Sequence, residues 1–284
     1  MHHKKSWSLC LVAVILLAAP AAGFGQAKKP AATPQAAAPG PKAAKEKIPD
    51  PKEILRRSCE FLKQQPQFSF KAEVENDRVY HGGKKLQFSQ EVTVSLQRPD
   101  KLRLDGNGDL ESKLLVLDGK TLTLYDKYKN HYATIDVTGD IDAALDKAYK
   151  VYGLRVGLAE LGSKNLCNQA LKDKVQALYA GRHMVRGVSC HHLAFDKKDV
   201  LYQVWIAAGD KPVIRKIVVT RKKLPASPQW TAYLSDWNFS PKFAADYFTF
   251  KPPAGAQKIK FIPVKQEAAP APQKGKSKKK GGKS

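Results

Sequence analysis

The sequence lacks the short motifs that identify common hydrolases, nucleotide-binding proteins and zinc proteins. It contains no Gly-x-Ser-x-Gly elbow, no His-Glu-x-x-His motif, no glycine-rich phosphate loop and no paired cysteines with zinc-ligand spacing. It also carries no signature of a nucleic-acid recognition module. We therefore expect a non-enzymatic protein with no catalytic residues, no metal, no cofactor and no nucleic-acid partner.

Cysteine is scarce. Of the four cysteines, Cys10 lies in the N-terminal apolar run, so an exported chain would keep Cys59, Cys167 and Cys190. In an oxidising compartment three cysteines allow one disulfide and one remaining thiol. We predict a Cys167–Cys190 disulfide, and three buried thiols are the alternative.

Long hydrophobic runs are almost absent. The single long one covers residues 9–22, follows Lys4 and Lys5, and is followed by small residues. This layout is typical of a secretory signal peptide. The run contains Pro20 and is shorter than the ~20 apolar residues that a membrane span needs. We expect a cleaved signal peptide over residues 1–27 and a periplasmic protein, with an uncleaved anchor as the alternative.

Acidic residues are the minority, because 26 Asp and Glu stand against 49 Lys and Arg, for a net charge of +23. Residues 28–49 are mainly Ala, Pro and Lys, and residues 265–284 end in a lysine-rich tail. Neither segment can bury enough apolar surface to order itself. We expect a disordered linker and a disordered basic tail around one domain, residues 50–264. The basic segments suit anionic envelope lipids, and solubility alone is the alternative.

The most regular part of the chain predicts an antiparallel meander. Three runs rich in β-branched and aromatic residues, 188–195, 200–207 and 213–220, are separated by the turn-forming residues 196–199 and 209–212. In the second run both alternating sets of side chains are largely apolar. A strand with one solvated face would not need this, so both faces must be covered.

Helices are expected at two places, with strands between and after them. Asp50, Pro51 and Glu53 form a helix start, and Pro66 ends that helix. Residues 140–152 carry apolar side chains at helical spacing. Together with the meander this predicts a mainly β (α+β) fold, a curved open half-barrel. Further strands are expected over residues 68–75, 86–97, 101–105, 113–117, 121–125, 129–137, 175–184 and 230–239.

Several sequence segments resemble a family of uncharacterised predicted periplasmic proteins, a bacterial domain of unknown function. The segments are DPKEILRR at Asp50, DGKTLTLYD at Asp118, GVSCHHLAF at Gly187, QVWI at Gln203, RKIVVT at Arg215, LSDW at Leu234 and FTFKPPAGA at Phe248. That family is similar to the outer-membrane lipoprotein carrier and receptor superfamily. The resemblance covers about residues 50–261 and implies an open, strongly curved antiparallel sheet with helices plugging its concave face. It also implies an apolar cavity for acyl chains, and it supplies no defined ligand residues.

We therefore expect a protein that binds or carries a lipophilic ligand, such as an acyl chain, a lipid or a lipoprotein. The ligand would lie between the sheet and the helices at residues 50–63 and 140–152, where each buried methylene contributes ~0.8 kcal/mol. The alternative is a structural or interaction protein of the envelope, whose own side chains fill this space. The candidate cavity residues are Leu55, Leu62, Leu145, Tyr152, Phe195, Trp205 and Trp237.

One cluster, Cys190-His191-His192, suggests metal or nucleophile chemistry. Successive side chains of a strand point to opposite faces, so His191 and His192 would not reach the same ion, whereas Cys190 and His192 share a face. We assign no metal site here. An envelope hydrolase that uses Cys190 and His192 is the least favoured of the three functions considered.

Overall fold

The computed structural model describes residues 48–168, 171 and 175–264. The chain divides into two units, residues 1–46 and 47–284, and every described residue belongs to the second. The expected signal peptide, nearly all of the expected linker and the expected basic tail lie outside the described residues. Within these residues no helix is both long enough and apolar enough to cross a membrane.

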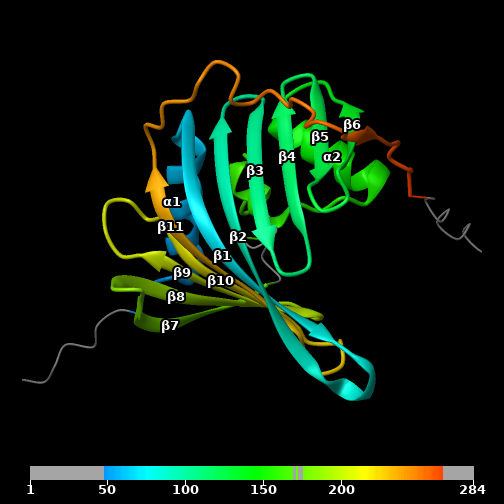
Figure 1. Ribbon diagram of the computed structural model, residues 1–284. Helices are drawn as coiled ribbons and strands as arrows, with labels where there is room; N and C mark the ends of the chain where they lie inside the picture. The colour runs from blue at the N-terminus through cyan, green and yellow to red at the C-terminus, as the bar shows by residue number, and fades with distance from the viewer. Residues whose placement is uncertain (1–47, 169–170, 172–174, 265–284) are drawn as a thin grey trace, which may run out of the picture. The chain divides into compact units, whose positions relative to one another are not determined.

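Strands dominate the described part of the chain (Figure 1). The helical elements are α1 (Pro51–Gln64), α2 (Ile141–Tyr152) and the 3-10 helices η1 (His81–Gly83) and η2 (Gly157–Gly162). The strands are β1 (Gln67–Val79), β2 (Lys85–Gln97), β3 (Lys101–Gly108), β4 (Ser112–Asp118), β5 (Thr121–Asp126), β6 (His131–Asp136), β7 (Gln176–Val185), β8 (Val188–Asp196), β9 (Val200–Ala207), β10 (Ile214–Arg221), β11 (Gln229–Asn238) and β12 (Gln257–Lys258).

These strands form one open sheet with the order β12-β6-β5-β4-β3-β2-β1-β11-β10-β9-β8-β7. Every neighbouring pair is antiparallel except β6 with β12. Two meanders, β1–β6 and β7–β11, are therefore joined where β1 pairs with β11. The expected mainly β fold with an open antiparallel sheet is confirmed.

Helix α1 begins and ends where the sequence predicts. The Asp50 carboxylate accepts a hydrogen bond from the Lys52 backbone N–H at 2.9 Å, and the helix stops at Gln64, before Pro66. One face of the helix is buried against the sheet, and it consists of Leu55, Ser58, Cys59 and Leu62. Full burial of a leucine side chain contributes about 1.5–3 kcal/mol, so this face holds the helix on the sheet.

Helix α2 is capped at both ends. The Asp140 carboxylate accepts a hydrogen bond from the Ala143 N–H at 3.2 Å, and Gly153 ends the helix with a left-handed backbone at φ 66°. The buried face consists of Ile141, Ala144 and Ala148, and its small alanines let the helix approach its neighbours closely. Leu145 and Tyr152 are half-buried at the sides of this face and pack against the core.

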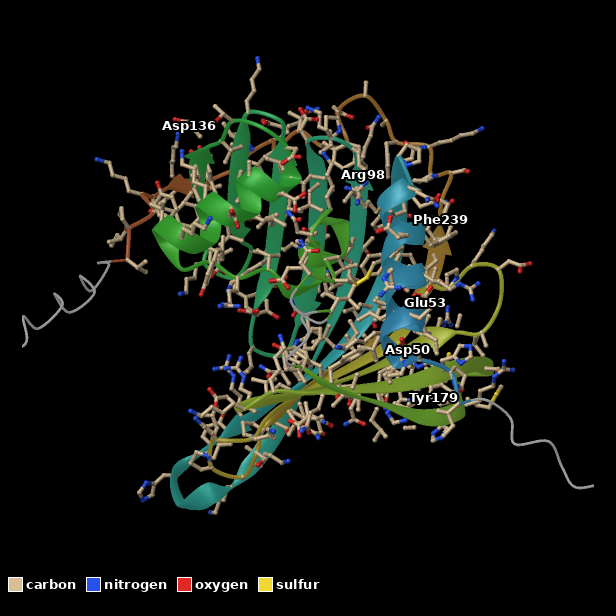
Figure 2. The ribbon with its side chains drawn as sticks, turned by 180° about the vertical axis from the view of Figure 1, so that it is seen from behind. Asp50, Glu53, Arg98, Asp136, Tyr179 and Phe239 are labelled. Atoms are coloured by element: carbon tan, nitrogen blue, oxygen red, sulfur yellow. A yellow bond between two sulfur atoms is a disulfide. The ribbon has the colours of Figure 1, made fainter. Side chains whose placement is uncertain are left out.

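A single large apolar core lies between the helices and one face of the sheet. Figure 1 shows the strands in front of the helices, and Figure 2 shows α1 and α2 in front of the strands. The core joins residues of α1, α2 and η2 to those of both meanders. Its largest fully buried side chains include Phe68, Phe70, Leu96, Leu117, Phe195 and Ile206.

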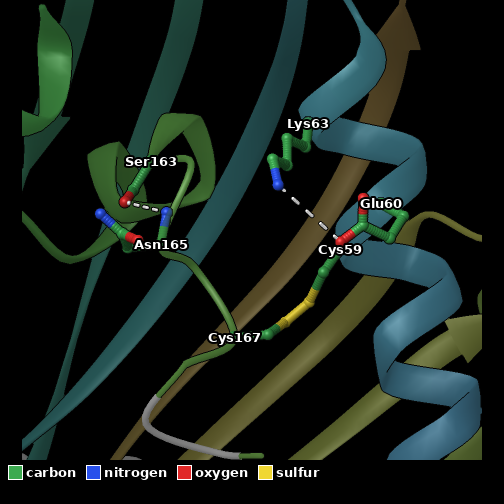
Figure 3. The surroundings of a disulfide bond; sticks show 6 residues. All are labelled: Cys59, Glu60, Lys63, Ser163, Asn165 and Cys167. Carbon is green, nitrogen blue, oxygen red and sulfur yellow. Dashed lines mark hydrogen bonds and ion pairs between the residues drawn. A yellow bond between two sulfur atoms is a disulfide. The ribbon is translucent and has the colours of Figure 1, made fainter.

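The disulfide joins Cys59 to Cys167, so the predicted Cys167–Cys190 pairing is wrong (Figure 3). Cys59 is on the buried face of α1, and Cys167 follows η2, which contacts that helix. The two Cα atoms are 6.2 Å apart, within the range that a disulfide bridges. Cys190 has the opposite parity on β8 to the core residues Leu193 and Phe195, so its thiol points to the other face of the sheet.

The β1–β2 hairpin is longer than the sequence predicts. The expected strand over residues 68–75 continues to Val79, because Asn76, Asp77 and Arg78 still pair with β2. Asn76 and Asp77 have low strand propensity, but they lie at the end of a long hairpin in the middle of the sheet, where hydrogen bonding to β2 outweighs that preference. The hairpin therefore extends past the core (Figure 1).

Candidate functional site

Six of the seven candidate cavity residues lie in or against the core on the helix-covered face. Leu55, Leu62 and Phe195 are 4%, 1% and 1% exposed, so their side chains occupy the space that a ligand would need. The other three, which pack against the core and are partly exposed, are Leu145, Tyr152 and Trp237. The ring of Trp237 stacks on Phe70 with centroids 4.4 Å apart. In the structure these six residues therefore contribute to the packing of the core.

Trp205 does not belong with them, because it lies on the opposite face of the sheet. Its neighbours Val204 and Ile206 face the core, so the alternation of the strand directs Trp205 away from the helices. The His192 ring stacks on its indole at 3.9 Å, and the Lys216 ammonium lies 4.7 Å from the indole centre. Within the described residues, Trp205 is therefore covered by side chains of the same sheet.

A pocket of about 350 Å³ opens between the first two turns of α1 and the β7–β10 side of the sheet. Its volume is within the range of small-molecule sites. In Figure 2 the labelled residues near this region are Asp50, which precedes α1, Glu53 on α1 and Tyr179 on β7. The lining residues are Ile54, Arg57, Arg182, His191, Ile206, Ala207, Ala208, Gly209, Asp210 and Pro212.

One wall of the pocket is a row of side chains across three strands. Arg182 on β7 is directly opposite His191 on β8, and His191 is directly opposite Ile206 on β9. Directly opposed residues share a face, and the buried Ile206 shows that this is the helix-covered face. Ile54 and Arg57 lie one turn apart on α1 and contribute the helix side of the pocket. The two walls therefore each pair an isoleucine with an arginine.

The pocket carries an excess of positive charge. Neither Arg57 nor Arg182 forms an ion pair with a carboxylate of the described residues. The single acidic lining residue is Asp210. A guanidinium offers several N–H donors in a planar fork that matches a carboxylate or phosphate group. The arrangement therefore suits an anionic group bound beside an apolar one.

His191 is held neutral in this pocket. Burial lowers the pKa of its imidazole, and the nearby positive charges of Arg182 and Arg57 lower that pKa further. Its Nδ1 lies 3.1 Å from the Tyr179 hydroxyl, within hydrogen-bonding distance. At neutral pH the imidazole can therefore serve as a hydrogen-bonding group without adding charge.

The Cys190-His192 pair does not form an activated nucleophile. Burial raises the pKa of the Cys190 thiol, and the thiol donates to the Val188 carbonyl at 3.4 Å. The His192 ring hydrogen-bonds to Gln203 at 3.0 Å and stacks on Trp205. Across the described residues, no three His, Cys, Asp or Glu side chains are arranged to hold a metal ion. As expected from strand alternation, His191 and His192 point to opposite faces.

The two half-buried histidines, His191 and His192, predict a loss of stability at mildly acidic pH. Burial lowers the pKa of His192, as it does that of His191. The hydrogen bond to Gln203 raises the pKa of His192, whereas the positive charges of His183 and Lys216 lower it further. The unfolded chain takes up these protons near pH 6.5, whereas the folded chain resists them. The free energy of unfolding is therefore fully maintained above about pH 6.5 and falls as the pH decreases below it.

Chemical denaturation between neutral and mildly acidic pH measures this dependence. In the double variant His191→Gln/His192→Gln the curve should be flatter than in the native protein. The matched control His81→Gln, which alters an exposed histidine of η1, should leave the curve unchanged. An equally steep curve in the double variant would assign the dependence to other groups.

Sequence reasoning missed Arg57, Arg182 and His191 as a group. They come from α1, β7 and β8, and nothing in their spacing along the chain predicts that they meet. The one available signal was the strand alternation that separates His191 from His192, because it places His191 on the same face as Leu193 and Phe195.

No curated protein matches this sequence. Similar solved structures include an uncharacterised conserved protein from Thermus thermophilus, with 10% identity over 74% of this chain and 98% of that chain, at a TM-score of 0.45. Another is MucB of Pseudomonas aeruginosa in its complex with MucA, with 15% identity over 72% of this chain and 62% of that chain, at a TM-score of 0.40. A third is a LolA superfamily protein from Nitrosomonas europaea, with 9% identity over 70% of this chain and 97% of that chain, at a TM-score of 0.37.

The last of these comes from the lipoprotein-carrier superfamily that the sequence segments resemble. Because these TM-scores are below 0.5, we take no ligand, partner or activity from the likeness. The family match is direct and covers residues 51–262, nearly all of the expected domain. The chain therefore belongs to the family described as predicted periplasmic protein, DUF2092.

Proposed function

We propose that this protein binds and carries an amphiphilic molecule, a lipid or an acylated molecule with an anionic group, in the pocket between α1, strands β7–β9 and the β9–β10 turn. The observation that carries the proposal is that each wall of the pocket places an arginine beside an isoleucine, and that neither arginine forms an ion pair with a carboxylate of the described residues. The function is that of a binding protein, with no covalent chemistry assigned to any residue.

The apolar part of the ligand would lie against Ile54 and Ile206. Ile206 is a fully buried member of the core, and Ile54 packs against the core, so the pocket is continuous with the apolar interior. Each methylene buried there contributes ~0.8 kcal/mol. A ligand longer than the pocket would need α1 to separate from the sheet, because Leu55 and Leu62 already fill the space beneath the helix.

The anionic part of the ligand would lie between Arg57 and Arg182. Hydrogen bonds that involve a charged group are worth about 1.5–3 kcal/mol each, more than neutral ones. Asp210 lies on the turn that forms the far rim of the pocket and would repel an anion placed near it. The charge distribution therefore fixes the orientation, with the head group toward α1 and β7.

The double variant Arg57→Gln/Arg182→Gln should lose the bound amphiphile. The natively purified protein is extracted with organic solvent, and the extract is analysed by mass spectrometry for anionic lipids and fatty acids. We expect an anionic amphiphile from the native protein and at least about a tenfold smaller amount from the double variant, since two charge-assisted contacts are removed.

Arg56→Gln is the matched control, because Arg56 is the neighbouring arginine on α1, forms an ion pair with Glu53 and does not line the pocket. This variant should retain the native amount of ligand. Extracts that contain no amphiphile from any variant, or an amount that is equal in all of them, would contradict the proposal.

A structural or interaction role is the second candidate, and the packing of the core favours it. The candidate cavity residues Leu55, Leu62 and Phe195 are almost fully buried by protein atoms. A protein of this kind would give a clean lipid extract and would act through its outer surface. The extraction experiment therefore distinguishes the two candidates.

A further inference from the structure

Three turns meet at one end of the sheet, opposite the end that holds the pocket. With the strand ends that flank them, they are residues 77–86 at the β1–β2 turn, residues 196–200 at the β8–β9 turn and residues 221–228 at the β10–β11 turn, and we call them the hairpin end. The strand pairing places them side by side, and the Gln229 backbone N–H donates to the Asp77 carboxylate at 2.9 Å. Figure 1 shows the β1–β2 turn and the β10–β11 turn extending together at this end.

The hairpin end is strongly basic. It contains eight Lys and Arg residues and three Asp residues, for a net charge of +5. The three aspartates are Asp77, Asp196 and Asp199, and each forms an ion pair with a lysine of the same end. The acidic groups are thus already neutralised by close partners.

Five basic residues of the hairpin end form no ion pair with the described residues. Such side chains are hydrated on a free surface, and their attraction to an anionic surface makes the free energy of binding to that surface more favourable. The ammonium of Lys197 lies 5.3 Å from the centre of the Tyr202 ring, and the other four have no such contact with an aromatic ring in the part of the chain that the structure describes. The five residues are Arg78, Lys84, Lys197, Lys198 and Arg221.

Large apolar side chains project from the same turns. Tyr80 is 48% exposed and Leu86 is 51% exposed, on either side of the β1–β2 turn, and Leu224 on the β10–β11 turn is similarly exposed. An exposed tyrosine and leucine among basic residues are what an interfacial membrane contact uses, because the apolar groups enter the acyl boundary while the cations meet phosphates.

A polar hollow of about 390 Å³ lies between the hairpin end and the start of β7. It is lined by Gln176, Asp196, Lys197, Lys198 and Lys222. Three lysines around one hollow provide ammonium donors for a phosphate group, and Asp196 is already paired with Lys222. The hollow has the charge and size to receive a phospholipid head group.

We propose that the hairpin end docks on the surface of an anionic lipid bilayer. The basic side chains contact lipid phosphates, and Tyr80 and Leu86 enter the interface. This proposal does not depend on the pocket, because the two regions lie at opposite ends of strands β8, β9 and β10.

The test measures co-flotation of the full chain with vesicles of phosphatidylcholine alone and of phosphatidylcholine mixed with phosphatidylglycerol. We expect binding to the mixed vesicles only. The triple variant Arg78→Gln/Lys84→Gln/Arg221→Gln should bind these vesicles on the order of 100-fold more weakly, because each basic residue near an anionic surface is worth about fivefold. The variant Tyr80→Ser/Leu86→Ser should lose the part of the binding that persists at high salt.

The matched control is Lys120→Gln/Lys129→Gln/Lys242→Gln, which removes three exposed lysines outside the hairpin end. Its affinity should stay within about twofold of the native value, since long-range charge alone is screened. An equal loss in both triple variants would assign binding to overall charge and overturn the proposal. Equal binding to neutral vesicles, or a Tyr80→Ser/Leu86→Ser variant that binds as the native protein at high salt, would also overturn it.

Discussion

Replacing Cys59 by serine is expected to lower the free energy of unfolding by roughly 4–5 kcal/mol. The disulfide to Cys167 closes a loop of 108 residues. In the chain-entropy description, a cross-link that closes a loop of this length lowers the conformational entropy of the unfolded chain, which stabilises the folded protein by that amount of free energy. For a domain of this size the melting temperature should fall by about 10 °C or more. Thermal and chemical denaturation under oxidising conditions measure both quantities.

Cys190→Ala is the control for this experiment. Cys190 is buried on the other face of the sheet and is in no disulfide within the described residues, so its replacement leaves the cross-link intact. Adding a reductant should lower the stability of the native protein and of Cys190→Ala by the same amount, and should not affect Cys59→Ser. A large loss in Cys190→Ala together with a small loss in Cys59→Ser would show that the pairing is different.

Most of the fold could be predicted from local patterns. The start of α1 follows from Asp50 and Pro51, and the β4–β5 hairpin follows from Asp118 and Gly119, where the carboxylate accepts two backbone N–H groups and the glycine has φ 94°. The alternation of residues 200–207 likewise places Val204 and Ile206 on one face and Trp205 on the other. Each of these features depends only on residues that are close together along the chain, so it can be predicted from the sequence.

Features that depend on distant neighbours were not predicted. The disulfide partner of Cys167 depends on how η2 packs against α1, and the cover over Trp205 depends on the pairing of β9 with β8 and β10. Apart from Trp205, the apolar residues proposed for a cavity lie on the helix-covered face. Apolar pattern alone does not say whether such a face holds a ligand or its own side chains.

The candidate site was missed for the same reason. Arg57 and Arg182 are 125 positions apart, and they meet because α1 crosses β7 and β8. An irregularity in the β7–β8 pairing, between Tyr179 and Gly181, sets which residue faces His191. A charged residue on an amphipathic helix usually points to solvent, so no local signal distinguished Arg57 from Arg56.

The pocket and the hairpin end should be energetically independent. They share strands β8–β10 but no residue, and substitutions that are well separated usually have additive effects. Variants of the arginines in the pocket should therefore keep native vesicle binding, and variants of the hairpin end should keep the native amount of extracted ligand. A protein with these properties would dock through one end of its sheet and hold its ligand near the other.

Replacing Arg98 by alanine is expected to cost about 3 kcal/mol of stability. Arg98 lies between β2 and β3, and its guanidinium donates to the carbonyls of Gln65 at 3.0 Å and Gly162 at 2.7 Å, with a longer bond to Leu62 (Figure 2). These carbonyls are at the C-terminal ends of α1 and η2, where backbone acceptors lack helical partners and a cation is favoured. The Arg98 side chain thus connects both α1 and η2 to the sheet through hydrogen bonds.

Burial lowers the pKa of Arg98, and the carboxylates of Asp142 and Asp140 oppose that shift, so the group stays charged at neutral pH. Removing it leaves the carbonyls without their donor, and hydrogen bonds from a charged group are worth about 1.5–3 kcal/mol each. Arg98→Lys keeps the charge but has no planar fork to reach separate carbonyls, so it should show an intermediate loss. Arg78→Ala, at the exposed β1–β2 turn, should change stability by less than about 0.5 kcal/mol. If Arg98→Ala changed stability as little as Arg78→Ala, the guanidinium would not hold α1 and η2, and the disulfide and the core would be their main attachments.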